Sequence, residues 1–246
     1  MTFDLDGDDA ELGVVCVHGF TGSPFEVRYL GESLARAGIA ASGSWLPGHG
    51  TTVDDLDRRR WIEWSDAVER SVDAMAKRVR KVAIAGQSLG GLLALHVAAR
   101  RPDVAAVASL AAPLWLEGLA KLASRYALAL GIERLPKLGG SDIADPEVKR
   151  INPSYRAVPV RALAQLVDFM RVVDDELPRL AQPVLVVHAR HDHTAPVACA
   201  YRIAKRTRAE RLRILPRSYH LIAADIERDI VAAEVISFVR RQRCAT

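Results

Sequence analysis

The stretch Val82-Ala83-Ile84-Ala85-Gly86-Gln87-Ser88-Leu89-Gly90-Gly91 decides the fold that we predict for this chain. Apolar residues typical of a buried strand run into Gly86-Gln87-Ser88-Leu89-Gly90, and an apolar helical pattern follows to residue 99. A strand that reverses sharply into a helix holds the serine in a strained backbone conformation, and the flanking glycines avoid clashes there. The pattern therefore predicts a strand, a tight turn that exposes the Ser88 hydroxyl, and a buried helix.

Short apolar runs alternate with longer helical patterns on both sides of this stretch. Such alternation favours an α/β fold with a mostly parallel sheet and helices on both faces. Most runs are continuously apolar, as expected for strands that are covered on both sides. The predicted strands span residues 13–17, 39–44, 82–85, 104–110, 184–188 and 212–215. We expect one domain over residues 1–246, since this length can bury a large core.

A serine hydroxyl is a weak nucleophile at neutral pH, so Ser88 needs a nearby base and a carboxylate that orients the base. In a strand-turn-helix architecture of this kind, the chain order is serine, acid, histidine. His220 follows the strand 212–215 and Asp192 follows the strand 184–188, at the sheet edge where catalytic loops gather. We predict Ser88 as the nucleophile, His220 as the base and Asp192 as the acid.

Three other acidic residues are weaker candidates for the acid. Asp225 and Asp229 come after His220, and we expect them to cap and open the last helix. Glu210 precedes the strand 212–215, so it lies at the opposite end of that strand.

The oxyanion of an acyl-transfer reaction needs backbone N–H donors from the residue after the nucleophile and from a loop after an early strand. Leu89 supplies the first donor. The early strand 13–17 runs into the glycine-rich turn His18-Gly19-Phe20-Thr21-Gly22, and we predict the N–H of Phe20 as the second donor.

These motifs resemble those of the α/β-hydrolase superfamily, and within it the small bacterial carboxylesterases and monoacylglycerol-lipase-like enzymes. The resemblance covers nearly the whole chain and rests on residues 18–22, 46–50, 86–91, 192–196 and 218–220. It implies cofactor-free hydrolysis of short to medium acyl esters or monoglycerides. Two positions depart from the family pattern: Ala195 stands where valine is commoner, and Tyr219 where glycine is commoner, so the pocket near His220 is expected to differ.

The stretch 114–181 holds helical patterns but no convincing strand, and we predict a small helical lid inserted there. Some of its apolar residues are expected to line an acyl pocket, and the others to pack against the main domain. They are Leu116, Leu119, Leu122, Tyr126, Leu128, Leu130, Leu163, Leu166, Val167, Phe169 and Met170. Before it, apolar residues at spacings of three and four predict one helix over about 54–79.

Three histidines outside the predicted triad are interpreted as structural. His18 and His49 lie near the site in related folds, and we expect them to hold loops by hydrogen bonds. His96 falls in the buried helix after Ser88, where a core position is expected.

Composition argues against several other classes of protein. The 34 basic and 30 acidic residues give a net charge of +4 without one basic block, so no nucleic-acid partner is required. Three cysteines form no C-x-x-C pair, which suits a reducing compartment. The first eleven residues carry five acidic side chains, unlike a signal peptide, and no apolar run reaches the ~20 residues of a membrane span. We expect a cytoplasmic protein that acts on a small-molecule ester.

Two rival functions come from other classes. His188, His191, Asp192 and His193 form a dense set of potential metal ligands. However, neighbouring residues of an extended segment point in opposite directions, so the set is not expected to converge on one ion. The second rival is a non-catalytic binding protein that keeps the fold. Acyl transfer, perhydrolysis and C–C bond hydrolysis remain open within the same fold.

Overall fold

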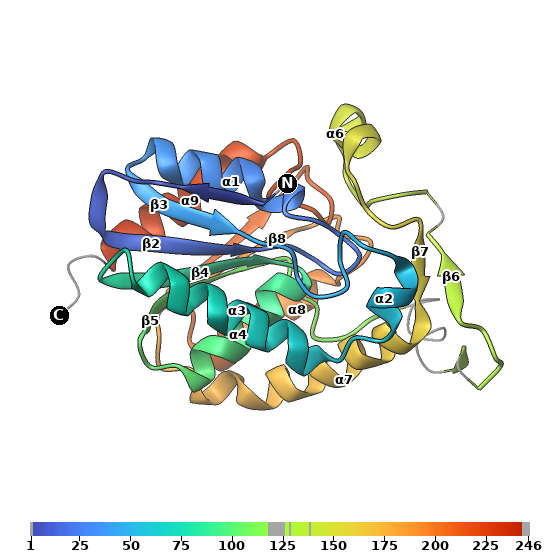
Figure 1. Ribbon diagram of the computed structural model, residues 1–246. Helices are drawn as coiled ribbons and strands as arrows, with labels where there is room; N and C mark the ends of the chain where they lie inside the picture. Colours follow the sequence, from blue (N-terminus) through green and yellow to red (C-terminus); the bar gives the residue numbers. More distant parts are fainter. Residues whose placement is uncertain (1, 118–125, 128, 138, 243–246) are drawn as a thin grey trace.

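The computed structural model describes residues 2–117, 126–127, 129–137 and 139–242. Seven strands form one sheet in the order β1-β3-β2-β4-β5-β8-β9, and only β1 runs antiparallel to its neighbour (Figure 1). The strands are β1 (Phe3–Leu5), β2 (Asp9–Val17), β3 (Ile39–Gly43), β4 (Lys81–Gln87), β5 (Val104–Leu110), β8 (Val184–Ala189) and β9 (Arg211–Leu215). The predicted mostly parallel α/β sheet is confirmed, and all six predicted strands are present. The sequence pattern missed only the short edge strand β1 in this sheet.

Helices cover both faces of the sheet, as predicted. Apolar side chains of α1 (Phe25–Arg36) and α9 (Arg228–Arg241) pack on one face. The other face is covered by α3 (Trp61–Ala76), α4 (Leu89–Arg100), α7 (Val160–Glu176) and α8 (Val197–Thr207), and Figure 1 shows the two layers on opposite sides. Continuously apolar strands thus find apolar partners above and below them.

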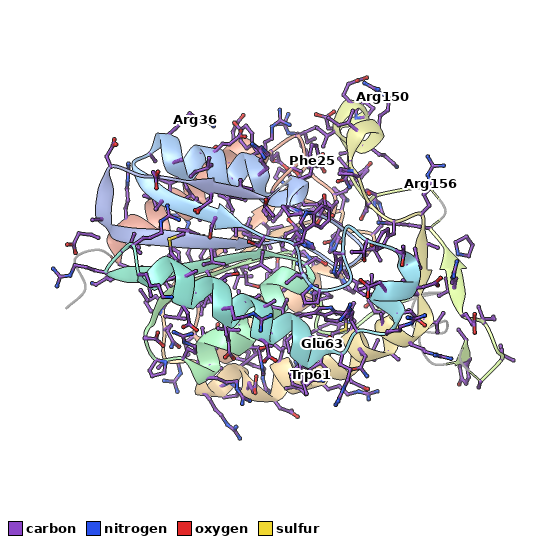
Figure 2. All side chains as sticks on the ribbon, viewed as in Figure 1. Phe25, Arg36, Trp61, Glu63, Arg150 and Arg156 are labelled. Carbon is purple, nitrogen blue, oxygen red and sulfur yellow. The ribbon has the colours of Figure 1, made fainter. Side chains whose placement is uncertain are left out.

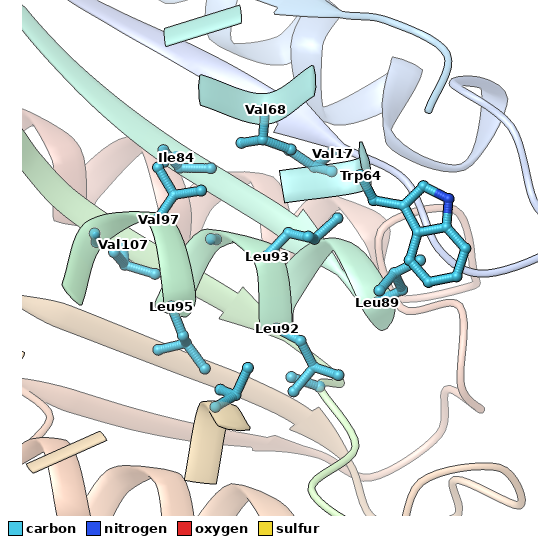
Figure 3. Close-up of a cluster of buried hydrophobic side chains, with 14 of the residues drawn as sticks. Val17, Trp64, Val68, Ile84, Leu89, Leu92, Leu93, Leu95, Val97 and Val107 are labelled. Atoms are coloured by element: carbon cyan, nitrogen blue, oxygen red, sulfur yellow. The ribbon is translucent and has the colours of Figure 1, made fainter. Parts of the chain in front are cut away.

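Helix α4 is the centre of the second layer. Residues 89–98 are all buried, because the helix lies between the sheet and the helices α3 and α7. Figure 3 shows Leu92 and Leu93 of this helix among the apolar side chains of the cluster, and Trp64 of α3 beside Leu89. Full burial of each such side chain contributes roughly 1.5–3 kcal/mol to folding. This packing fixes the start of α4, and hence the turn before it.

The predicted helix over 54–79 is instead two helices, α2 (Val53–Asp57) and α3. Arg60 has an extended backbone, and its N–H donates to the Glu63 carboxylate at 2.7 Å, which begins the second helix. The apolar stripe that predicts a helix begins at Trp61. It therefore carries no information on residues 54–60, where the first helix ends.

The segment between β5 and β8 contains a feature that the sequence pattern missed. Strands β6 (Arg134–Pro136) and β7 (Ala157–Pro159) form a two-stranded antiparallel sheet, so the prediction of no strand in 114–181 is wrong. Each strand has three residues, too few for an alternating pattern, and each ends in proline, which argues against a strand. The segment also holds α6 (Pro146–Ile151), α7 and the short helix η1 (Leu177–Arg179).

The carboxyl ends of the parallel strands meet at one edge of the sheet. The turn 18–22 follows β2, Ser88 follows β4, and the loops of Asp192 and His220 follow β8 and β9. This edge therefore brings together segments that lie far apart in the sequence. Among the helices in the described ranges, none combines the length and apolar character that a membrane span would require.

Candidate active site

Ser88 lies in the turn between β4 and α4, with a backbone conformation of φ 59° and ψ −117°. The left-handed φ is unfavourable for a residue with a side chain, and close packing on both sides maintains it. A Cβ atom on Gly86 would lie 1.9 Å from the carbonyl oxygen of Gly90, and one on Gly90 would lie 2.1 Å from that of Val17. Only glycine fits at either position, as the sequence pattern indicated.

The structure brings together the three side chains that were predicted to act as a triad. The Ser88 hydroxyl donates to Nε2 of His220 at 2.8 Å, and Nδ1 of His220 donates to Oδ2 of Asp192 at 2.8 Å. Oδ1 of Asp192 accepts the backbone N–H groups of Thr194 (2.8 Å) and Ala195 (2.7 Å). The histidine is therefore held in the tautomer that accepts a proton from the serine.

Neighbouring charges shift the pKa values of both His220 and Asp192. Burial opposes the charged form of His220, but the adjacent Asp192 carboxylate, together with Asp142 and Glu26, outweighs burial and raises the pKa of His220 above 6.5. Burial likewise opposes charge on Asp192, yet His220 and His188 together lower its pKa below the ordinary value. Nε2 of His188 donates to the carbonyl oxygen of Ala195 at 2.9 Å and lies 3.2 Å from Oδ2 of Asp192.

We expect kcat/KM for an ester to fall on the acid side with a midpoint above pH 6.5. His220 must be neutral to accept the serine proton, and a raised pKa means that it becomes protonated already above that pH. Below the midpoint the rate should fall about tenfold per pH unit. Initial rates with a neutral substrate between about pH 5 and 9 would measure this limb. A midpoint clearly below 6.5 would contradict the coupling of His220 to Asp192.

Two neutral histidines hold the turn that follows β2. Nε2 of His49 accepts the N–H of Thr21 at 3.1 Å, and Nε2 of His18 accepts the N–H of Leu46 at 3.1 Å. Burial lowers the pKa of His49 to about 4, and burial with the neighbouring His49 lowers the pKa of His18 well below 6.5. Both rings act as acceptors only while neutral, which agrees with the predicted loop-holding role.

This turn lies directly against the serine. A Cβ atom on Gly19 would lie 3.2 Å from Cβ of Ser88, and the N–H of Gly19 donates to the buried Glu26 carboxylate at 2.8 Å. Phe20 and Ser88 both line the same cavity. Leu89 opens α4, where backbone N–H groups lack partners within the helix. The predicted oxyanion donors, Phe20 and Leu89, are thus on the two segments that flank Ser88, and their role stays a prediction.

A cavity of about 470 Å³ opens beside Ser88 and His220. Leu116, Leu163, Leu166 and Met170 line it, as the lid prediction proposed for some of these residues. Phe169 is buried in the core, Tyr126 and Leu130 are exposed, and Leu119, Leu122 and Leu128 lie outside the described residues. The other apolar lining residues are Pro113, Leu135, Pro136, Val158 and Leu221, and Glu26, Lys137, Asp142 and Thr194 add polar groups.

The set of potential metal ligands near Asp192 does not converge. His188 contacts Asp192, whereas Nδ1 of the exposed His193 bonds to Asp142 at 2.8 Å, and His191 is exposed to solvent. Within the part of the chain that the structure describes, no group of three or more His, Cys, Asp or Glu side chains is placed to hold a metal ion. His96 packs in the core and bonds to Glu176.

Sequence reasoning missed several residues that hold the loops of the site. The Gln87 side chain donates to the His220 carbonyl at 2.8 Å and accepts the N–H of Ala223 at 3.2 Å. Glu227 accepts the N–H of Ser218 at 2.8 Å and is the N-cap position of α9. Asp225 is fully buried and does not cap this helix, so the expectation for Asp225 is wrong, whereas Asp229 lies in the first turn as expected. The sequence shows these residues only as a glutamine and two acidic residues within otherwise apolar stretches. Their hydrogen-bond partners are backbone groups, which no sequence pattern identifies.

Comparison with known proteins gives consistent matches over most of the chain. Residues 8–227 match the family described as Serine aminopeptidase, S33. A thermostable monoacylglycerol lipase of Bacillus sp. (strain H-257) is 30% identical, over 94% of this chain and 91% of the relative. A carboxylesterase of Bacillus subtilis (strain 168) is 25% identical, over 97% and 96% of the two chains. A solved structure described with LipS and LipT, two metagenome-derived lipolytic enzymes, has a TM-score of 0.89 at 28% identity and covers 98% of this chain and 97% of its own.

Proposed function

The chain belongs to the Serine aminopeptidase, S33 family of α/β-hydrolases, and on this premise we propose that it hydrolyses carboxylic esters through an acyl-enzyme intermediate. The observation that carries the proposal is the relay Ser88–His220–Asp192, with two 2.8 Å contacts at the wall of a largely apolar cavity. Relatives named as a lipase and an esterase support ester hydrolysis.

In the proposed mechanism, the Ser88 oxygen attacks the ester carbonyl carbon while Nε2 of His220 takes the hydroxyl proton. The carbonyl oxygen becomes negatively charged and accepts hydrogen bonds from the N–H groups of Phe20 and Leu89. Asp192 stabilises the imidazolium, which then gives its proton to the departing alcohol. A water molecule then gives a proton to His220 and attacks the acyl-enzyme carbonyl carbon, and the imidazolium returns this proton to the Ser88 oxygen as the carboxylic acid leaves.

The cavity supports short to medium acyl esters or monoglycerides as substrates. Its volume of about 470 Å³ is in the range of small-molecule sites, and its wall is mainly apolar, with five leucine side chains beside Phe20, Val158 and Met170. We further propose one domain over residues 1–246, with 114–181 as a lid that supplies part of this wall. A cytoplasmic location remains a proposal that the cysteine pattern supports. The metal-dependent and non-catalytic alternatives are not favoured.

A series of p-nitrophenyl esters of increasing acyl length tests the substrate class. We expect hydrolysis with an optimum at short to medium chains, because longer chains exceed the cavity, and irreversible inhibition by a fluorophosphonate. Since the family is described as serine aminopeptidases, aminoacyl p-nitroanilides belong in the same assay. Cleavage of the anilides with no ester hydrolysis would contradict the proposal.

A further inference from the structure

The loop that carries His220 is docked on a segment from the insertion between β5 and β8. The N–H of Leu221 donates to the Asp142 carbonyl at 3.1 Å. Ile143 and Val148 form a small buried apolar cluster with Leu221 and Ala224, flanked by Phe25. Figure 1 shows α6 projecting away from the sheet, and Figure 2 shows its Arg150 pointing outward and Phe25 near its base. Residues 142–148 of this projection therefore contact the histidine loop.

One buried carboxylate joins the two segments. Oδ1 of Asp225 accepts the N–H groups of Ala144 at 3.0 Å and Asp145 at 2.9 Å, both on the insertion. Oδ2 of Asp225 accepts the N–H of Tyr219 at 2.7 Å, and Tyr219 is the residue next to His220. Asp225 is 0% exposed, so water does not compete for these bonds. The side chain thus ties the neighbour of His220 to residues about 75 positions earlier in the chain.

We propose that Asp225 is a positioning residue, which sets the place of His220 by locking the histidine loop onto residues 141–148. The inference rests on the ester hydrolysis proposed above. Gln87, the last residue of β4, donates to the His220 carbonyl at 2.8 Å, so the histidine loop is held both from the turn that carries Ser88 and from the insertion. Loss of either anchor lets the imidazole move, and displacements near 1 Å in a catalytic group cost roughly 100-fold in rate.

The same segment also contacts the loop of the acid. The Asp142 carboxylate accepts the N–H of His193 at 2.9 Å and bonds to Nδ1 of His193 at 2.8 Å. Residues 141–148 therefore touch both loops that carry triad side chains, one residue away from Asp192 and from His220. Docking of this segment aligns the two loops with each other.

The direct test is Asp225→Asn, with Asp229→Asn as the matched control. Both carboxylate oxygens of Asp225 accept hydrogen bonds from backbone N–H groups. Asparagine has the same shape, but its NH₂ group is a donor and would face one of these N–H groups, so that hydrogen bond would be lost. Asp229 is exposed, lies four residues further on and bonds to Tyr29 away from the histidine loop. We expect Asp225→Asn to lower kcat roughly 10- to 100-fold per titrated active site, with KM changed less than about threefold. Asp229→Asn should stay within about twofold of wild type.

The pH profile separates positioning from a general loss of stability. Against the effect of burial, the carboxylates of Asp192, Asp142 and Glu26 raise the pKa of His220, and Asp192 contributes most of this. A weaker contact with Asp192 and with Asp142 lowers that pKa, so the acid limb of kcat should move to lower pH in Asp225→Asn. Hydrogen exchange should also become faster in residues 141–148 and 217–224 together. A folded Asp225→Asn protein with wild-type kcat and an unmoved acid limb would overturn the proposal.

A second variant covers the case in which Asp225→Asn does not fold. Val148→Ala weakens the apolar docking from the insertion side without removing a polar group. This variant should lower kcat roughly two- to fivefold and move the acid limb of the pH profile to lower pH. A kcat and an acid limb equal to those of the wild type would overturn the proposal. A failure of the proposed ester hydrolysis can be told apart from a failure of this inference. If the function is wrong, the wild-type protein hydrolyses no ester, but hydrogen exchange in the Asp225→Asn protein still becomes faster in both segments if they are docked on each other.

Discussion

Replacement of Ser88 by alanine should lower kcat/KM for a p-nitrophenyl ester by roughly 10⁴- to 10⁶-fold. The variant lacks the only hydroxyl that contacts His220 at 2.8 Å among the described residues, so no acyl-enzyme can form. Alanine keeps the Cβ atom and lacks only the hydroxyl, so the backbone strain at φ 59° is unchanged and we expect little change in thermal stability. Steady-state kinetics and a melting curve on the same preparation would measure both effects.

Ser109→Ala is the matched control for this experiment. Ser109 lies on β5 opposite Gly86, is buried, and its hydroxyl has no hydrogen-bond partner in the described part of the chain. Its loss should leave kcat/KM within about threefold of wild type. Ser88→Ala activity within tenfold of wild type would contradict the assignment of the nucleophile.

Asp192→Asn should lower kcat roughly 10⁴-fold while the fold is retained. The amide oxygen can replace Oδ1 and accept the N–H groups of Thr194 and Ala195, which leaves NH₂ facing Nδ1 of His220. The imidazole then carries its proton on Nε2, so it cannot accept the proton of Ser88. Stopped assays at high enzyme concentration over a range of pH would measure the residual rate.

The control for Asp192→Asn is Asp174→Asn, at a site remote from the relay. Asp174 pairs with Arg202 at 2.7 Å on the surface, and surface pairs contribute roughly 0–1 kcal/mol to stability. Activity should not change. If Asp192→Asn retained more than about a tenth of wild-type kcat, another acid would have to orient His220.

The sheet and the identity of the three relay residues follow from local sequence signals. Continuous apolar runs mark the parallel strands because both of their faces are covered, and glycines beside Ser88 mark a turn in which a Cβ would clash. Because loops after parallel strands share one edge of the sheet, the sequence alone places Asp192 and His220 near Ser88. The contacts between the three side chains agree with that expectation.

Three features could not be predicted from the sequence: the role of Asp225, the strands β6 and β7, and the break between α2 and α3. Asp225 precedes a helix by a few residues, which is typical of a cap, yet its carboxylate binds backbone groups of the insertion. Strands β6 and β7 pair over three residues each and end in prolines, so neither propensity nor periodicity marks them. The break between α2 and α3 comes from the bond of Arg60 to Glu63, in a run of arginines without a helix breaker.

Peptide mapping after reaction with a fluorophosphonate identifies the nucleophile. We expect a single stoichiometric adduct on Ser88, formed at a rate that falls on the acid side along with ester hydrolysis, and no adduct in the Ser88→Ala protein. An active enzyme that carries the adduct on another residue, or none at all, would contradict this expectation.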